Sequence, residues 1–148
     1  MIAFPVIAIF SACFDKQALR QEDQEKALLY ENAQRHWEGR RWNIPSRAAA
    51  FYEDPLVRAR QEGVLKQENR KFTDISVLHV ALDEKTDEDA LVVKSQGDSE
   101  KKWLRTGTVW VRVEGFGTDN ILKVEEKEQR WYRTGAGWWI QREGQTAP

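Results

Sequence analysis

The feature that most constrains the fold of this chain is the order of its sequence patterns: a helix-forming segment comes first, and strand-forming segments follow it. Residues 22–42 contain no proline, and Leu29, Tyr30, Ala33 and Trp37 fall on one stripe when the chain turns by about 100° per residue. From residue 72 onward, β-rich runs alternate with turn sequences. Helices followed by a run of antiparallel strands predict an α+β fold, with N-terminal helices packed against a curved antiparallel sheet.

Two shorter helices are expected after the first one. Pro45 ends the first helical segment, and Ser46 is placed to cap a second helix that runs as far as Tyr52. Pro55 stops that helix, and residues 56–63 add one or two further turns before Gly63 breaks them.

The strand-forming runs cover residues 72–83, 90–94 and 102–114, and residues 121–133 and 137–142 form a closing hairpin. In the run 102–114, Val109, Val111 and Val113 share one face, while Trp110 and Arg112 take the other. The sequence contains no βαβ alternation and no internal repeat. We therefore expect a single domain over residues 22–143, followed by a polar tail at residues 144–148.

The cysteine count and the charge balance narrow the possible classes of protein. With Cys13 as the only cysteine, the chain can form no intrachain disulfide, so a hydrophobic core must hold the domain together. Lys and Arg number 23 and Asp and Glu number 24, and no basic block is present to neutralise phosphates. We therefore expect no nucleic-acid partner.

The N-terminus has the character of an export signal. Residues 1–12 carry no charge, and they end in Ser11 and Ala12 directly before Cys13. An apolar run of about 10 residues is too short to span a bilayer as a helix, but it matches the apolar region of a signal peptide. The arrangement resembles the lipobox of bacterial lipoproteins. That resemblance implies a signal peptide at residues 1–12, lipidation of Cys13, a tether over residues 13–21 and attachment to the membrane through the lipid.

The lipoprotein resemblance also bears on location. Phe14, rather than an aspartate, follows Cys13, and by lipoprotein sorting rules this implies the outer membrane of a Gram-negative cell, with the domain facing the periplasm. Two other readings stay open: a signal that is cleaved without lipidation, and a short buried segment in which Cys13 packs as a small hydrophobe. If residues 1–13 are not a signal, we expect a cytoplasmic protein.

The element order and the closing hairpin resemble those of the nuclear-transport-factor-two-like superfamily. The shared features are a long first helix with an inward-facing Trp37, a short second helix with Phe51 and Tyr52, and an aromatic hairpin at residues 129–140. The resemblance covers residues 22–143 and implies a cone, in which a bent sheet wraps around the helices. The superfamily includes ketosteroid-isomerase-like enzymes as well as non-catalytic binding, assembly and immunity domains, so the fold alone does not select a function.

An enzyme with this fold would need an acid or a base inside the cone. His79 is the candidate, because it lies in mid-strand, shares a face with Val77 and Ala81, and can act near neutral pH. The alternative is a structural or solvent-facing histidine. If the cone is hollow, we expect a ligand pocket lined by Trp37, Tyr52 and His79.

No motif for a metal ion or a cofactor is present. His36 and His79 are the two histidines, and the sequence contains no His-x-x-x-His, Cys-x-x-Cys, glycine-rich phosphate loop or dinucleotide fingerprint. We therefore expect neither a bound metal nor a cofactor.

The seven tryptophans are the remaining signal. Trp138 and Trp139 are adjacent, so they must point to opposite faces of a strand. An exposed tryptophan near arginines can anchor a protein partner, and the alternative is tryptophan packed on arginine across strands. The candidates for a partner surface are Trp110, Trp138, Trp139 and Arg133.

The sequence therefore predicts a non-enzymatic envelope lipoprotein, whose domain binds a protein partner or helps to assemble an envelope complex. Two alternatives stay open. One is an enzyme or small-ligand binder that uses the cone interior, and the other is an immunity-type protein that binds a toxin.

Overall fold

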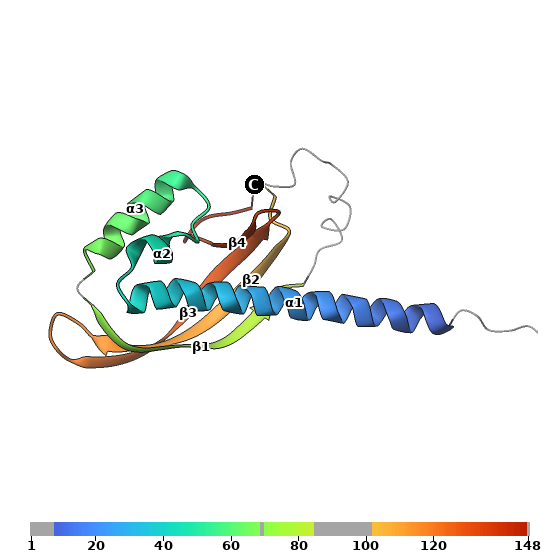
Figure 1. Cartoon of the computed structure of the whole chain (residues 1–148), viewed down its shortest axis with the longest axis horizontal. Coiled ribbons are helices and arrows are strands. Elements are labelled where there is room, and N and C mark those ends of the chain that lie inside the picture. The colour runs from blue at the N-terminus through green and yellow to red at the C-terminus, as the bar shows by residue number, and fades with distance from the viewer. Residues whose placement is uncertain (1–7, 69, 85–101, 148) are drawn as a thin grey trace, which may run out of the picture.

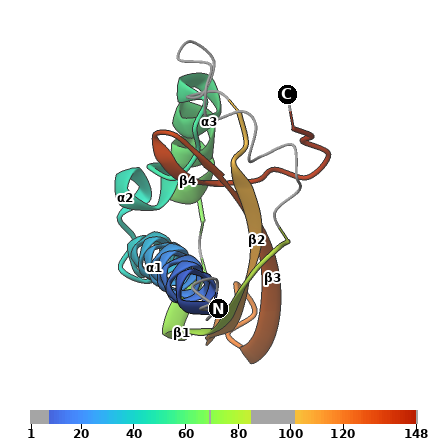
Figure 2. The ribbon, with the colours of Figure 1, turned by 90° about the vertical axis from the view of Figure 1, so that its right-hand side faces the viewer.

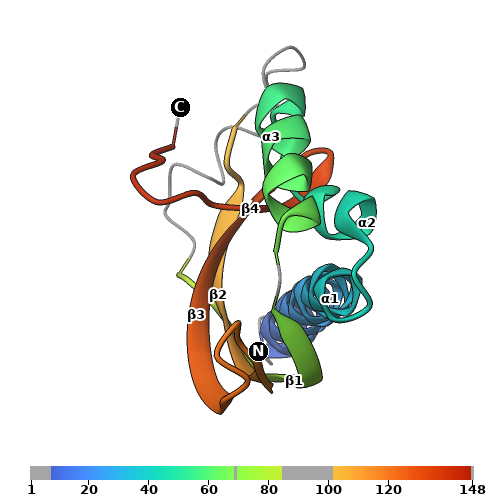
Figure 3. The same ribbon diagram turned by 90° about the vertical axis from the view of Figure 1, so that its left-hand side faces the viewer.

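The computed structural model describes residues 8–68, 70–84 and 102–147, and for residues 8–15 it describes the backbone alone. The elements within these residues are α1 (Ala8–Arg41), α2 (Pro45–Ala49), α3 (Pro55–Lys66), β1 (Lys71–Leu82), β2 (Arg105–Phe116), β3 (Leu122–Thr134) and β4 (Gly137–Ile140). The strands form one antiparallel sheet in the order β1-β2-β3-β4. The sheet is curved, and the helices lie on its concave side (Figures 1 and 3). The predicted α+β fold is confirmed.

The first helix, α1, is longer than the sequence predicted. It spans 34 residues, so residues 13–21, expected as a tether, belong to the helix. Six of its nine residues are Lys, Gln, Ala, Leu or Arg, which are strong helix formers. The second half of α1 buries Leu29, Ala33 and Trp37 against the sheet, whereas Tyr30, expected on the same stripe, is 37 % exposed. The first half extends beyond the sheet as an arm (Figure 1).

The two short helices begin at prolines. Pro45, rather than Ser46, opens α2, with Ile44 at the N-cap position. Proline suits the first position of a helix, because its φ is already helical and its missing N–H has no partner there. In α3, the Asp54 carboxylate caps the helix by accepting from the Leu56 N–H at 2.9 Å. The expectation that Gly63 ends this helix is wrong, since α3 continues to Lys66: glycine lowers helix stability without blocking the hydrogen-bond ladder.

The strands follow the sequence pattern, with one exception. The runs expected at residues 72–83, 102–114, 121–133 and 137–142 correspond to β1, β2, β3 and β4, and the run expected at residues 90–94 lies outside the described residues. Val109, Val111 and Val113 of β2 are buried, as the alternation predicted. They form one core with Leu29 of α1 and Trp131 of β3.

Ion pairs fasten α1 to the sheet next to this core. The buried guanidinium of Arg105 on β2 lies 3.2 Å from the Glu22 carboxylate and 3.4 Å from that of Glu25. Arg133 on β3 contacts Glu25 at 3.3 Å. Since both glutamates are on α1, these contacts set how the helix lies across the concave face (Figure 2).

Candidate functional site

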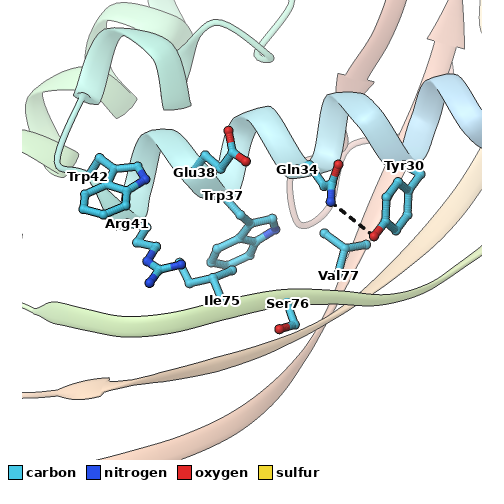
Figure 4. A pocket seen from close by; sticks show the side chains of 9 residues that line it. All are labelled: Tyr30, Gln34, Trp37, Glu38, Arg41, Trp42, Ile75, Ser76 and Val77. Carbon is cyan, nitrogen blue, oxygen red and sulfur yellow. Dashed lines mark hydrogen bonds between the residues drawn. The ribbon is translucent and has the colours of Figure 1, made fainter.

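A groove runs between α1 and β1, and we call it the α1–β1 groove (Figure 4). Its volume is about 380 Å³. Its lining comes from two elements and the residue that follows α1: Tyr30, Gln34, Trp37, Glu38, Arg41 and Trp42 on the helical side, and Ile75, Ser76 and Val77 on the strand.

Helical and strand periodicity together produce this lining. Positions 30, 34, 37, 38 and 41 recur every three or four residues and so fall on one side of α1. On β1, the side chains of Ile75 and Val77 point into the groove from alternate positions. Trp37 is buried and forms the floor, whereas Trp42 is 65 % exposed. The groove therefore combines an apolar floor with an aromatic side chain that solvent can reach.

Arg41 closes one end of the groove. Its guanidinium donates to the backbone oxygen of Thr73 at 3.1 Å and lies 3.7 Å from the Asp74 carboxylate. It also lies over the ring of Trp42, 5.0 Å from the centroid. Toward the other end, the Gln34 amide donates to the Tyr30 hydroxyl at 3.2 Å. These contacts hold the rim residues in place.

The strand that borders the groove is an edge strand. Among the described strands, β1 pairs with β2 alone. Its register with β2 shifts between Phe72 and Asp74 and again between Val77 and His79, so the four residues from Asp74 to Val77 form a regular stretch between two irregularities. Three of these four residues, Ile75 to Val77, line the groove.

A second depression, which we call the α3 hollow, lies between α1, α3 and β3. Its volume is about 450 Å³. The residues that line it are His36, Arg40, Tyr52, Gln61, Val64, Leu65, Gln67, Glu68 and Gln129. Arg40 is paired with Glu68 at 2.7 Å, so the charges of these two lining residues offset one another.

A buried hydrogen-bond network stands behind the α3 hollow. His36 Nδ1 lies 2.7 Å from the backbone oxygen of Ala48, and because a carbonyl oxygen can only accept, Nδ1 carries the proton. His36 Nε2 is then an acceptor, 3.5 Å from the amide nitrogen of Gln129. The amide oxygen of Gln129 accepts from Trp37 at 3.3 Å and from Trp131 at 2.9 Å. One glutamine thus joins α1 to β3.

Burial keeps His36 neutral. Burial lowers the pKa of His36 to about 4, the hydrogen bond to Ala48 opposes this, and the nearby positive charge of Arg40 adds to the lowering. At neutral pH the imidazole is therefore an uncharged part of the core. The arrangement can hold α1 and α2 together and present polar groups to the hollow.

The residues expected to line one pocket are not brought together. Trp37 lines the α1–β1 groove, and Tyr52 lines the α3 hollow. His79 is exposed and stacks on Trp110 at 5.2 Å between ring centroids. The register shift between Val77 and His79 breaks the expected alternation, so these two residues do not share a face.

The expected partner-surface residues are largely engaged within the protein. Trp138 is 2 % exposed and belongs to the core rather than to the surface. Trp139 is half-buried and donates to the Thr134 hydroxyl at 2.9 Å, and half-buried Arg133 contacts Glu25. Trp110 is half-buried under His79.

Sequence reasoning missed Trp42, Arg41 and the buried role of His36. His36 could have been found, because it lies three residues after Ala33 and so extends the buried side of α1. Trp42 follows the end of α1 and carries no periodic signal. Cys13, the expected lipidation site, lies on α1, but its side chain is outside the described residues.

Among the side chains that the structure describes, no group of three His, Cys, Asp or Glu residues is placed to hold a metal ion. Comparison of the chain with protein-family models, with curated proteins and with solved structures finds no match. The likeness to the nuclear-transport-factor-two-like superfamily therefore stays a prediction.

Proposed function

We propose that this protein is a non-enzymatic envelope lipoprotein, anchored through Cys13, whose domain binds a protein partner in the α1–β1 groove. The observation that carries this proposal is the groove itself. It joins a buried apolar floor at Trp37 to the exposed ring of Trp42, beside a strand edge that has no described neighbour. Tryptophan and arginine are enriched at the energetic centres of protein interfaces, and Arg41 lies directly against Trp42.

The length of α1 supports an anchored arrangement. Cys13 and Trp42 lie toward opposite ends of the helix, about 40 Å apart at 1.5 Å per residue. The arm of α1 projects from the sheet, and residues 16–21 on it are exposed and mostly polar (Figure 1). No described helix is long and apolar enough to cross a membrane. A lipid on Cys13 would hold the domain at the membrane while the rigid arm carries the groove away from it.

A small-ligand binder is the second candidate, and it would use the α3 hollow. The observation in its favour is the set of polar groups there, which includes Tyr52, Gln61 and Gln129. His36 is neutral and buried behind the hollow, so this arrangement favours binding over acid–base chemistry. An immunity-type protein is a special case of the first proposal, with a toxin as the partner in the α1–β1 groove.

The anchor is tested by expressing the chain with its own N-terminus beside a Cys13→Ser variant. We expect the parent protein to fractionate with membranes and to carry the mass of a diacylglyceryl group, and the variant to lose both. A soluble, unprocessed parent protein that still begins at Met1 would contradict the anchor.

The groove is tested by replacing Trp42 with a photo-crosslinking amino acid in the cells that express the chain with its own N-terminus. We expect one defined protein to be captured from position 42, and none from the same amino acid at Gln61 in the α3 hollow. Capture from position 61 alone would move the binding site to the hollow.

A further inference from the structure

We propose that the α1–β1 groove binds its partner as an extended peptide strand added to the edge of β1 that has no partner among the described strands. In this arrangement a bulky apolar side chain lies over Trp37, and a lysine or arginine lies opposite Glu38. The inference rests on the proposed protein-binding function and specifies how the groove recognises its partner.

The backbone of β1 provides the first argument. The strand is 12 residues long and pairs on one side with β2. In a strand paired on one side, every second residue directs its N–H and C=O groups away from the sheet, where they need water or another strand. An extended peptide can pair with several of these groups in succession, whereas a helix or a small molecule cannot.

The position of α1 provides the second argument. Figure 4 shows Trp37 above the strand and the side chains of Ile75 and Val77 beneath it, so the groove lies between α1 and one face of β1, the outermost described strand of the sheet. A strand added about 4.8 Å from β1 would direct every second side chain toward α1. The volume of about 380 Å³ gives room for a bulky side chain there. The edge thus supplies backbone hydrogen bonds, and the groove selects the side chain.

The charges along the rim provide the third argument. Arg41 is paired with Asp74 at 3.7 Å, and Glu31 is paired with Arg35 at 2.6 Å. Glu38 lines the groove and forms no ion pair with any described side chain. Among the charged residues that line the groove, Arg41 is thus paired and Glu38 is not, so the Glu38 carboxylate can pair with a basic residue in the bound segment.

A second copy of this chain fits the edge less well. The regular stretch of β1 between the two register shifts covers four residues. Bulges bend a strand and interrupt its pairing, so two copies would share a short run of hydrogen bonds. A stable dimer buries at least about 1,200 Å² in total. A short peptide needs no such area beyond the groove.

The test is a selection of random peptides, about 12 residues long like β1 itself, displayed on phage against the full-length chain. The selected peptides are then synthesised, and their dissociation constants are measured by titration calorimetry. We expect a consensus with a bulky apolar residue and a nearby Lys or Arg. Two sets of peptide amides are then methylated separately, those at odd positions and those at even positions. Methylating one set should weaken binding at least about tenfold and methylating the other should change it little, because only one set of amides faces β1.

Substitutions in the groove complete the test. Trp42→Ala and Glu38→Lys should each weaken binding at least about tenfold. The matched controls are Leu56→Ala and Glu143→Lys, which change exposed residues away from the groove and should bind like the parent. All four sites are exposed, and circular dichroism checks that each variant folds.

Three results would overturn the proposal. The first is that N-methylation of either set of amides changes peptide binding equally and that the peptides bind Trp42→Ala as well as the parent. This result would refute strand addition but not the proposal that the protein binds a protein partner. A dimer seen by sedimentation, and dissociated by Ser76→Pro on β1, would assign the edge to a second copy. If no peptide is selected and no protein is crosslinked from position 42, both the strand mode and the proposed function fail.

Discussion

Lowering the pH from 6.5 to about 4 is expected to weaken this fold through one side chain, His36. The pKa of a histidine in an unfolded chain is about 6.5, and burial lowers the pKa of His36 in the folded protein to about 4. Between these two values the unfolded chain binds a proton on His36 that the folded protein does not bind. Protonation therefore favours unfolding, and the stability present above pH 6.5 is lost as the pH falls toward 4.

The size of the loss follows from the same two values. Each unit of difference in pKa corresponds to about 1.4 kcal/mol, so the interval from 6.5 to about 4 corresponds to about 3 kcal/mol of unfolding free energy. This is a large share of the stability of a typical domain, about 5–15 kcal/mol. The cause is structural: the imidazole is 2 % exposed, and a charge there would lie near Arg40.

The assay is urea unfolding followed by tryptophan fluorescence across this pH range. The emission of the seven tryptophans, which include Trp131 at 6.1 Å from the imidazole between ring centroids, follows the unfolding of the core. We compare the parent with His36→Gln and with the matched control His79→Gln, since these are the two histidines of the chain. His36→Gln should be less stable at neutral pH, by about 1–3 kcal/mol, because one glutamine amide does not replace both hydrogen bonds. Its further loss toward pH 4 should be about 3 kcal/mol smaller than in the parent.

The reasoning is refuted if the parent and His36→Gln lose equal stability between pH 6.5 and 4, or if His79→Gln removes the loss. Proton NMR of the folded parent supplies an independent check. The His36 ring resonance should keep its neutral-form shift down to a pH near 4.

Two further predictions concern packing and charge, and urea unfolding measures both. Gly39→Ala should destabilise the protein by about 1–3 kcal/mol, because the added Cβ would lie 2.7 Å from the backbone nitrogen of Ala48. Gly63→Ala in α3 should instead stabilise the protein by about 1 kcal/mol, because open space surrounds Gly63 and alanine favours a helix more than glycine does. A loss of stability in Gly63→Ala equal to that in Gly39→Ala would contradict the close packing of α1 on α2. Arg105→Met should lower the free energy of unfolding by about 3 kcal/mol, because it leaves Glu22 and Glu25 of α1 without their buried partner. Arg35→Met removes one side of an exposed pair and should lower it by less than about 0.5 kcal/mol. Equal effects of these two substitutions would show that the buried ion pairs do not fasten α1.

The candidate site was only partly predictable. Trp37 and Tyr52 were expected in one pocket, and each does line a depression, but the two depressions are different. His79 was expected to face inward, and the register shift between Val77 and His79 turned it outward. Such a shift depends on how β1 pairs with β2, so the sequence of β1 alone does not predict it.

The sequence by itself determined the order of helices and strands and the buried side of α1 and of β2. The spacing of Leu29, Ala33 and Trp37 and the alternation of the β2 valines are local periodicities, and burial follows them because it removes the apolar side of each element from water. The tertiary structure alone decided that α1 lies against β1, the outermost described strand, which places Trp42 next to residues of β1 more than 30 positions away. The position of α1 depends on its contacts with Arg105 and Arg133 and on strand register. These contacts join residues far apart in the sequence, so they produce no periodic sequence pattern.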